Sequence, residues 1–360
     1  MSVAEFASLP SLRLSVRLKP LWSGLFGTPL NTALTVLTLV FLAWLLPPLA
    51  RWLVIDATWS GTAQECAARS GACWAFVGAK LRFIVFAFYP PDLQWRPLLV
   101  MILLVSLLTA TALPRFWRRQ TLFVWPLVIG LCWLLMSGAG LLPAVPSNQW
   151  GGLPVTLLVW TVCFGLAVPL AVLLALARRS RMGGLRTLAV VFIELMRGIP
   201  MVAILYVAML LLPMAVPGGQ YIDKTMRAII MITLFWSAYV AEVVRAGLQA
   251  IPAGQEEAAA ALGLGYWRTM QLVILPQALR QVIPGMVNLA IGFLLATSLL
   301  AVIGIFDLLN AARASATDPK WLGFYDEAYL VVAVVYFVLC FGGSRYSRWL
   351  EGHLGAAKPR

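Results

Sequence analysis

Long apolar stretches constrain the fold of this chain more than any other feature. Eight of them qualify as membrane spans, and they cover residues 31–53, 97–114, 122–142, 153–176, 188–213, 227–248, 281–306 and 328–343. A helix needs about 20 mostly apolar residues to cross a bilayer, and lipid admits only helices or closed barrels as spanning structures. These stretches are too continuously apolar for the alternating strands of a barrel. The pattern predicts an all-α membrane protein with about eight transmembrane helices.

The composition excludes several other classes of protein. Apolar residues make up 61% of the chain and charged residues 11%, whereas a soluble domain carries about 25% charged residues. The high apolar content also excludes a disordered chain. Because His353 is the only histidine, we expect no metal site built on a histidine cluster. A serine–histidine hydrolase would have to use His353 near the C-terminus, so a membrane-embedded enzyme remains a weak alternative.

Basic residues gather on one side of the predicted membrane topology. With the N-terminus inside, the inside segments carry 17 basic and four acidic residues, against nine basic and eight acidic residues outside. This asymmetry is the positive-inside pattern, so it places both termini in the cytoplasm. The basic residues are divided among five short loops and tails, whereas a nucleic-acid surface needs one clustered patch. We therefore expect a lipid bilayer as the surroundings and no nucleic acid as partner.

The chain divides near residue 150, at an uncharged segment rich in turn residues, 143–152. Residues 1–150 contain three predicted spans and a long outside loop, 54–96. Residues 151–345 contain five spans joined by short connections, and residues 346–360 form a tail. We therefore expect a five-helix core preceded by a three-helix extension.

Two of the five cysteines, Cys66 and Cys73, lie together in the outside loop. A disulfide between them is feasible if that side of the membrane is an oxidising periplasm. Two reduced thiols, or a metal pair without its other ligands, are the alternatives. The other cysteines fall within spans, where cysteine acts as a small apolar filler.

The most informative segment is the inside loop between the sixth and seventh spans, residues 249–280. Pro252 suits the first position of a helix, and Glu256 and Glu257 follow where the helix dipole favours negative charge. Four alanines favour continuation of the helix, and glycines at 263 and 265 can end it. We expect a helix of about ten residues, whose small alanine side chains suit a groove on another protein. Pro276 is then expected to break the next segment and redirect the chain.

This segment resembles the EAA signature of permease subunits in ABC importers. Glu257, Ala258 and Ala259 supply the E-A-A residues, Gly263 supplies the glycine, and Leu275 and Pro276 supply the final L-P, with Val273 in place of the usual isoleucine. The resemblance implies a type I importer fold (MetI-like) for residues 151–345. It also implies that these six residues form a coupling helix and its flanks, which dock on a separate ABC ATPase subunit. ATP and Mg²⁺ would bind to that ATPase, since this chain has no G-x-x-x-x-G-K-[ST] loop.

Two further motifs resemble those of polar amino-acid permeases. Glu194 and Arg197 belong to an E-x-x-R-G-x-P motif, and Glu242 and Arg245 to an A-E-x-x-R-x-G motif. Each pair is three residues apart, so each can meet on one helix face. A structural ion pair near a helix end and a role in gating or subunit contact are the two interpretations. The upstream spans resemble the extended N-terminus of general L-amino-acid permease subunits.

The seventh span departs from the family pattern, because Leu295 and Ala296 stand where two charged residues are common. Charges within a span usually mark a pathway or a pair. Their absence leaves Asn288, Thr297 and Ser298 as candidates for the substrate path. Packing of small residues between helices explains the region equally well.

Together these features predict a permease subunit of a binding-protein-dependent ABC importer for polar L-amino acids, located in the bacterial inner membrane. The resemblance implies three protein partners: ATPase subunits, a second related permease that forms a heterodimer with this chain, and a periplasmic amino-acid-binding protein. The alternative is a secondary amino-acid transporter driven by an ion gradient. Such a transporter needs no ATPase, and the lack of an inverted repeat counts against it.

Overall fold

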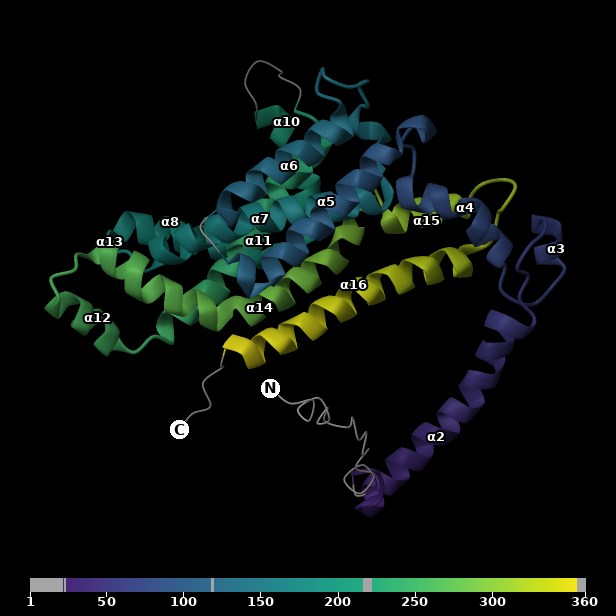
Figure 1. Cartoon of the computed structure of the whole chain (residues 1–360), viewed down its shortest axis with the longest axis horizontal. Helices are drawn as coiled ribbons and strands as arrows, with labels where there is room; N and C mark the ends of the chain where they lie inside the picture. Colours follow the sequence, from purple (N-terminus) through teal and green to yellow (C-terminus); the bar gives the residue numbers. More distant parts are fainter. Residues whose placement is uncertain (1–21, 23, 118–119, 216–221, 355–360) are drawn as a thin grey trace, which may run out of the picture. The chain divides into compact units, whose positions relative to one another are not determined.

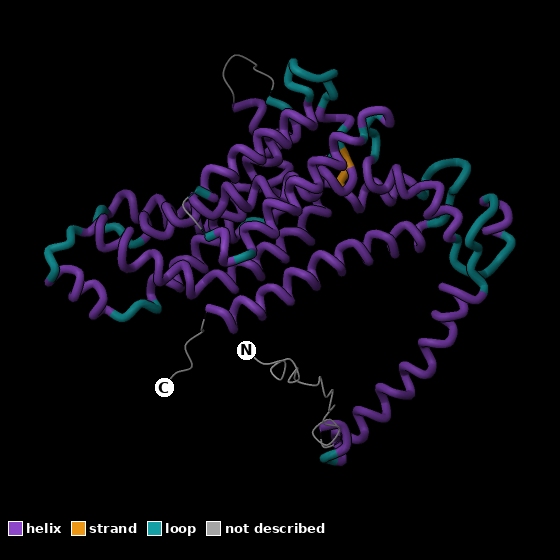
Figure 2. Tube along the Cα trace, in the orientation of Figure 1, coloured by secondary structure: helices purple, strands orange, loops and turns teal. Residues whose placement is uncertain are grey.

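The computed structural model describes residues 22, 24–117, 120–215 and 222–354. Contacts divide it into two compact units, Met1–Ala75 and Phe76–Arg360. The described residues are mostly helical, and the one named strand among them is the two-residue β1 (Phe306–Asp307) (Figure 2). The prediction of an all-α fold is confirmed.

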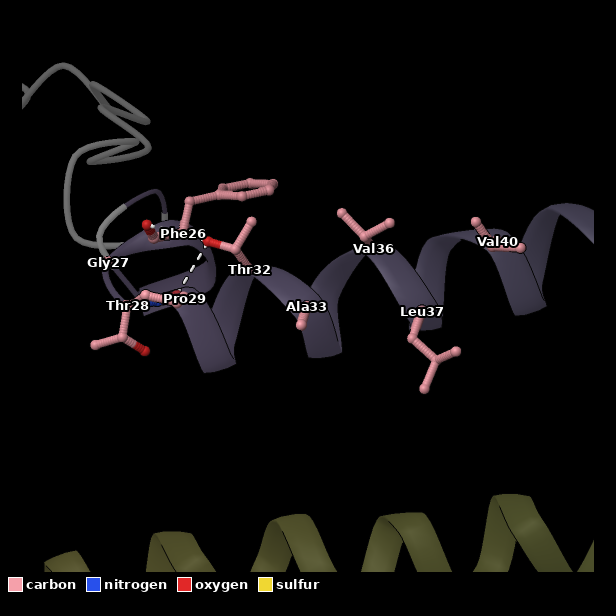
Figure 3. Close-up of a pocket in the computed structure, with 9 residues that line it drawn as sticks. All are labelled: Phe26, Gly27, Thr28, Pro29, Thr32, Ala33, Val36, Leu37 and Val40. Atoms are coloured by element: carbon pink, nitrogen blue, oxygen red, sulfur yellow. Dashed lines mark hydrogen bonds between the residues drawn. The ribbon is translucent and has the colours of Figure 1, made fainter.

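The first unit contains one long apolar helix, α2 (Pro29–Ala50), which continues into the π-helical turn η2 (Arg51–Ile55). The Thr28 side chain caps its start by accepting a hydrogen bond from the Asn31 backbone N–H. None of the α2 side chains is buried. Figure 3 shows a shallow hollow along its first turns, lined mainly by apolar side chains. A helix that is apolar on all sides suits a lipid environment, in agreement with the predicted span 31–53.

Beyond α2, the first unit is held by a disulfide between Cys66 and Cys73, whose Cα atoms lie 5.5 Å apart. Cys66 lies on the short helix α3 (Ala63–Ala67), which begins with a capping box formed by Thr62 and Glu65. Within the ring closed by the disulfide, a Cβ atom on Gly71 would lie 2.1 Å from the Asp56 carbonyl oxygen. Only glycine fits this close approach.

The second unit is a bundle of long helices with shorter elements between them. Its helices before the sixth predicted span are α4 (Trp74–Phe86, which starts at the boundary), η3 (Pro91–Leu93), α5 (Trp95–Ala112), η4 (Pro114–Phe116), α6 (Thr121–Ser137), η5 (Ser147–Gln149), α7 (Gly152–Arg178), α8 (Gly183–Gly198), α9 (Met201–Leu210) and α10 (Leu212–Ala215). They are followed by α11 (Lys224–Gln249), α12 (Ala253–Ala261), α13 (Tyr266–Thr269), η7 (Met270–Ile274), α14 (Leu275–Ala296), η8 (Thr297–Ile303), α15 (Leu308–Ser315) and α16 (Tyr325–Leu354).

Helices α7 and α11 form the centre of this bundle, since they share the most extensive helix contact. α14 packs on α11, α16 packs on α14, and α5 packs on both α6 and α7. One buried apolar cluster joins α5, α6, α7, α9 and α11. Helices α5 and α6 therefore belong to the same packed core as the five downstream spans. The boundary between the two compact units lies at Ala75–Phe76. The predicted division near residue 150 separates the extension from the five-helix core, and it stays a prediction.

Six helices among the described residues are long and apolar enough to cross a membrane, or seven if the bent pair α8 and α9–α10 is one span. The predicted span 188–213 is this bent pair, in which the helix axis bends by 104° between the two halves. Ile199 adopts extended backbone angles, φ −97° and ψ 134°, directly before Pro200. A residue before proline is disfavoured in the helical region, which explains the break that the apolar pattern alone conceals.

Other predicted boundaries shift because of local turn chemistry. α6 ends at Ser137, before the predicted end at 142, because Gly138 takes a left-handed conformation with φ of 84°. It is shorter than the helices that qualify as spans, so the predicted total of eight is not reached. The seventh predicted span begins earlier, at Tyr266, and finishes as the 3₁₀ segment η8 before Gly304. The eighth continues well beyond 343, to Leu354.

The junction predicted at 143–152 is tightly packed. Gly151 and Gly152 form parallel bridges with Phe306 and Asp307. Gly152 has a φ of 69°, and a Cβ atom there would lie 1.9 Å from the Val85 carbonyl oxygen. The junction therefore fixes the start of α7 against its neighbours in the second unit.

Candidate coupling surface and charged cluster

The EAA-like segment forms the short helix that its sequence predicts. α12 covers Ala253–Ala261, with Pro252 as its N-cap residue and Leu262 as its C-cap residue. Gly263 follows with a φ of 73°, the left-handed conformation that glycine adopts without strain. Figure 1 shows α12 at one end of the second unit, whereas α15 lies toward the opposite end. The helix thus lies outside the long helices that form the bundle.

Almost the whole surface of α12 is exposed. Glu257 and Ala258 face solvent, whereas Ala259 is 3% exposed, and α12 packs against η7. Leu262 at the C-cap is 80% exposed. Tyr266 and Trp267 of the neighbouring α13 are also 52% and 65% exposed, and large apolar side chains exposed together suit contact with another protein. Ala259 alone among the E-A-A residues contributes to packing within the chain.

Leu275 and Pro276 begin α14 and do not redirect the chain as predicted. α13, η7 and α14 form one continuous helical stretch from Tyr266 onward. The π-helical turn η7 ends at Ile274, two residues before Pro276, and the Leu275 N–H donates to the Met270 carbonyl. Because proline lacks an N–H and crowds the preceding turn, the wider turn accommodates it without a break. Sequence periodicity carries no signal for such a π-turn.

The four charged residues predicted to form pairs lie together in one cluster at the ends of α8 and α11. Glu242 Oε2 lies 2.9 Å from Arg245 Nη2, and Glu194 Oε2 lies 3.8 Å from Arg197 Nη1. Glu242 also lies 4.0 Å from Arg197. The structure therefore brings both predicted pairs into one network.

Sequence reasoning missed the residue at the centre of this network. Arg178 Nη1, at the end of α7, lies 2.6 Å from Glu242 Oε1 and 3.0 Å from Glu194 Oε1. It thus bridges the carboxylates of α8 and α11. Arg178 belongs to a run of basic residues that ends the fourth predicted span. That run was a signal for an inside loop, but only the fold shows which arginine meets the carboxylates.

The three substrate-path candidates do not share one surface. Asn288 is exposed on α14, whereas Thr297 is fully buried and its hydroxyl lies 3.2 Å from the Tyr336 hydroxyl of α16. Nine residues at 100° per residue separate Asn288 and Thr297 by about half a turn. Ser298 donates a hydrogen bond of 2.9 Å to the Leu295 carbonyl. Asn288 is therefore the candidate of the three with an exposed side chain free for a ligand.

Comparisons with known proteins identify the family of this chain. Residues 167–355 match the family described as "Binding-protein-dependent transport system inner membrane component". The chain belongs to this family. It is similar to the inner membrane amino-acid ABC transporter permease protein YhdY of Escherichia coli (strain K12), with 42% identity over 91% of this chain and 90% of the relative. It is also similar to the glutamate/glutamine/aspartate/asparagine transport system permease protein BztC of Rhodobacter capsulatus, with 35% identity over 92% of each chain.

A solved structure resembles just over half of the chain. The crystal structure of an amino acid ABC transporter with histidines aligns with a TM-score of 0.50 and 30% identity, and covers 56% of this chain and 92% of that one. The type I importer fold predicted for the core is therefore confirmed.

Family membership settles the class of protein. The chain is a multi-pass permease subunit of an ABC importer in the inner membrane, and not an enzyme. Such a system works with a substrate-binding protein and an ATPase as separate partners. The alternative of a secondary transporter driven by an ion gradient is thereby set aside.

Proposed function

We propose that this subunit imports polar L-amino acids and is driven through α12 by a separate ATPase. The exposed helix at the end of the bundle carries this proposal, because Glu257 and Ala258 present a surface that nothing in the described chain covers. Gly263 follows α12 in a left-handed turn, and Leu275 and Pro276 begin α14. ATP and Mg²⁺ bind to the partner ATPase in this proposal, and this chain transmits the resulting movement.

The amino-acid substrate rests on the similar proteins, whose names give amino acids as cargo. Asn288 is our proposed substrate contact, since its amide is exposed on α14. Thr297 and Ser298 remain on the same span, but the Thr297–Tyr336 contact favours a structural role for Thr297. The cluster of Glu194, Arg197, Glu242 and Arg245, on α8 and α11, is proposed to gate the substrate path.

The proposed orientation places α12 and both termini in the cytoplasm. Arg178 and Arg179 lie at the end of α7, Arg181 follows it, Arg186 lies in the first turn of α8, and Arg268 lies in α13. Basic residues favour the cytoplasmic side of a membrane. Other basic residues that support this orientation lie outside the described residues. They are Arg13, Arg17, Lys19, Arg118, Arg119, Lys358 and Arg360.

The proposed assembly contains a second, related permease, so that two five-helix cores face each other. The resemblance to general L-amino-acid permeases supports a heterodimer. The extension of residues 1–150 is proposed to precede this core, residues 151–345, and residues 346–360 form its cytoplasmic tail. When this chain carries a tag, we expect one different, related permease to co-purify with it.

Substitution Glu257→Lys tests the coupling role directly. We expect loss of amino-acid uptake and of substrate-stimulated ATP hydrolysis, with normal membrane insertion, because the reversed charge lies on the docking surface. Glu351→Lys is the matched control, since Glu351 is an exposed acid near the end of α16. Unchanged uptake by the Glu257 variant, or failure of positions 257–263 to cross-link to an ATPase, overturns the proposal. Competition for uptake by a panel of amino acids then identifies the substrate.

A further inference from the structure

Two consecutive arginines at the end of α7 contact different parts of the machinery. Arg178 bridges Glu194 and Glu242 in the charged cluster. Arg179 Nη2 lies 3.0 Å from Glu256 Oε1 on α12, and its Nη1 donates to the Leu248 carbonyl at 3.4 Å. At the end of α7, Arg179 thus contacts α12, and its neighbour Arg178 contacts the charged cluster of α8 and α11.

Few side-chain contacts hold α12 to the rest of the chain. Among the described residues, the Arg179–Glu256 contact is the one ion pair that involves α12. A second contact joins Gln277 Nε2 of α14 to Gln255 Oε1 at 3.2 Å. Ala259 is the one α12 residue that is buried. Arg179 therefore provides a direct side-chain contact between α12 and the end of α7.

We propose that Arg178 and Arg179 are positioning residues that transmit displacement of α12 to the charged cluster. The proposal rests on the coupling role of α12 proposed above. One peptide unit separates the two residues, so a shift of the Arg179 guanidinium moves the last turn of α7 that carries Arg178. Arg178 is shared by carboxylates from two helices, and a small movement changes its distances to both. The cluster thereby responds to the position of α12.

The exposure of the Arg179–Glu256 pair separates this role from a purely structural one. Their side chains are 33% and 45% exposed, and exposed ion pairs contribute little to stability. Loss of Arg179 should therefore leave the melting temperature almost unchanged. A transmission role instead predicts a defect in the ratio of substrate molecules imported to ATP molecules hydrolysed.

The experiment uses the complete complex in liposomes, with ATPase, partner permease and binding protein. In Arg179→Ala and Arg179→Glu, we expect uptake per ATP to fall between about twofold and thirtyfold, the range found for residues in coupling networks. The exchange of both charges, Arg179→Glu with Glu256→Arg, should restore the ratio at least in part. Arg181→Ala is the matched control, because Arg181 is exposed and forms no ion pair among the described residues.

The outcomes distinguish this inference from the proposed function. If Glu257→Lys abolishes uptake while both Arg179 variants keep the wild-type ratio, the link through α7 is wrong and the coupling role of α12 stands. If the ATPase no longer co-purifies with Arg179→Ala, Arg179 acts in docking and transmission is overturned. Failure of the wild-type α12 to cross-link to an ATPase removes both proposals.

Discussion

Arg178 and Glu242 form the closest ion pair of the charged cluster, with 2.6 Å between Nη1 and Oε1. Glu242 also pairs with Arg245 at 2.9 Å, and its side chain is only 15% exposed. Removal of one partner from a partly buried charge network leaves the remaining charges without compensation. Glu242 is therefore the residue on which the stability of this cluster depends most.

Glu242→Gln should destabilise the protein by about 1–3 kcal/mol, the cost typical of a charged hydrogen-bonding partner lost from a partly buried site. Thermal unfolding of the purified chain in detergent measures the change. Glu194→Gln provides the control, because the Glu194 side chain is 53% exposed and its loss should cost less than about 1 kcal/mol. Equal shifts for the two variants would contradict the central position given to Glu242.

Gly247 allows α14 to approach α11 closely. A Cβ atom at this position would lie 2.9 Å from the Ala278 carbonyl oxygen and 2.4 Å from Val282 Cγ1. Gly247→Ala should therefore destabilise the bundle by about 1–3 kcal/mol, as overpacking of a core does. Melting temperature and yield from membranes measure the effect.

Gly130→Ala is the matched control for this substitution. Gly130 also lies inside a helix, α6, but a Cβ atom there meets nothing within 4 Å. Alanine is favoured over glycine in helix interiors by about 1 kcal/mol, so this variant should be neutral or more stable. If both variants behave alike, the close approach at Gly247 does not limit packing.

The sequence predicted the all-α fold and the coupling helix because both depend on local patterns. Long apolar stretches mark spans, and the order of proline, acids, alanines and glycine marks α12. The break at Ile199–Pro200 was also local, but the continuous apolar pattern concealed it. Ile199 directly precedes Pro200, and the restriction on residues before proline marks this position as a helix boundary.

The rest of the candidate site required the tertiary fold. Arg178 was one of several basic residues in the same loop, and nothing in its neighbourhood along the chain distinguishes it from Arg181. The Thr297–Tyr336 contact joins residues 39 apart in sequence, so sequence alone could not show that Thr297 faces α16. Contacts of this kind depend on which helices pack together. The spacing of residues within one segment holds no information about that packing.

The disulfide gives a prediction that mass spectrometry can check. Arg69 lies between Cys66 and Cys73, so trypsin should cut the ring into two peptides that stay linked until a reductant is added. Prior alkylation of free thiols guards against exchange, and Cys340 serves as the internal control because it is a free cysteine. Recovery of alkylated Cys66 and Cys73 peptides without reductant would show that the bond is absent in membranes. Replacement of both cysteines by alanine should cost about 2–3 kcal/mol by the loop-entropy model.

Asp307 should make stability depend on pH in the mildly acidic range, between 3.8 and about 6. It lies outside the spans as N-cap residue of α15, where its carboxylate accepts hydrogen bonds from the Leu309 and Asn310 backbone N–H groups. Burial raises the pKa of this carboxyl from 3.8 to about 6, and the backbone hydrogen bonds oppose that rise. Between these two values the folded state binds more protons than the unfolded state, so stability falls as pH rises.

Asp307→Asn should remove this dependence, because asparagine resembles the protonated acid at every pH. The stability of the variant relative to the native chain should thus increase from pH 4 to pH 7, by up to roughly 3 kcal/mol for a shift of about two pKa units. Asp318→Asn is the control of opposite sign, since the hydrogen bond from Lys80 lowers the pKa of Asp318. That variant should lose stability at neutral pH and approach the native chain only in acid. A constant difference between Asp307→Asn and the native chain over this pH range would show that Asp307 ionises normally in the folded protein.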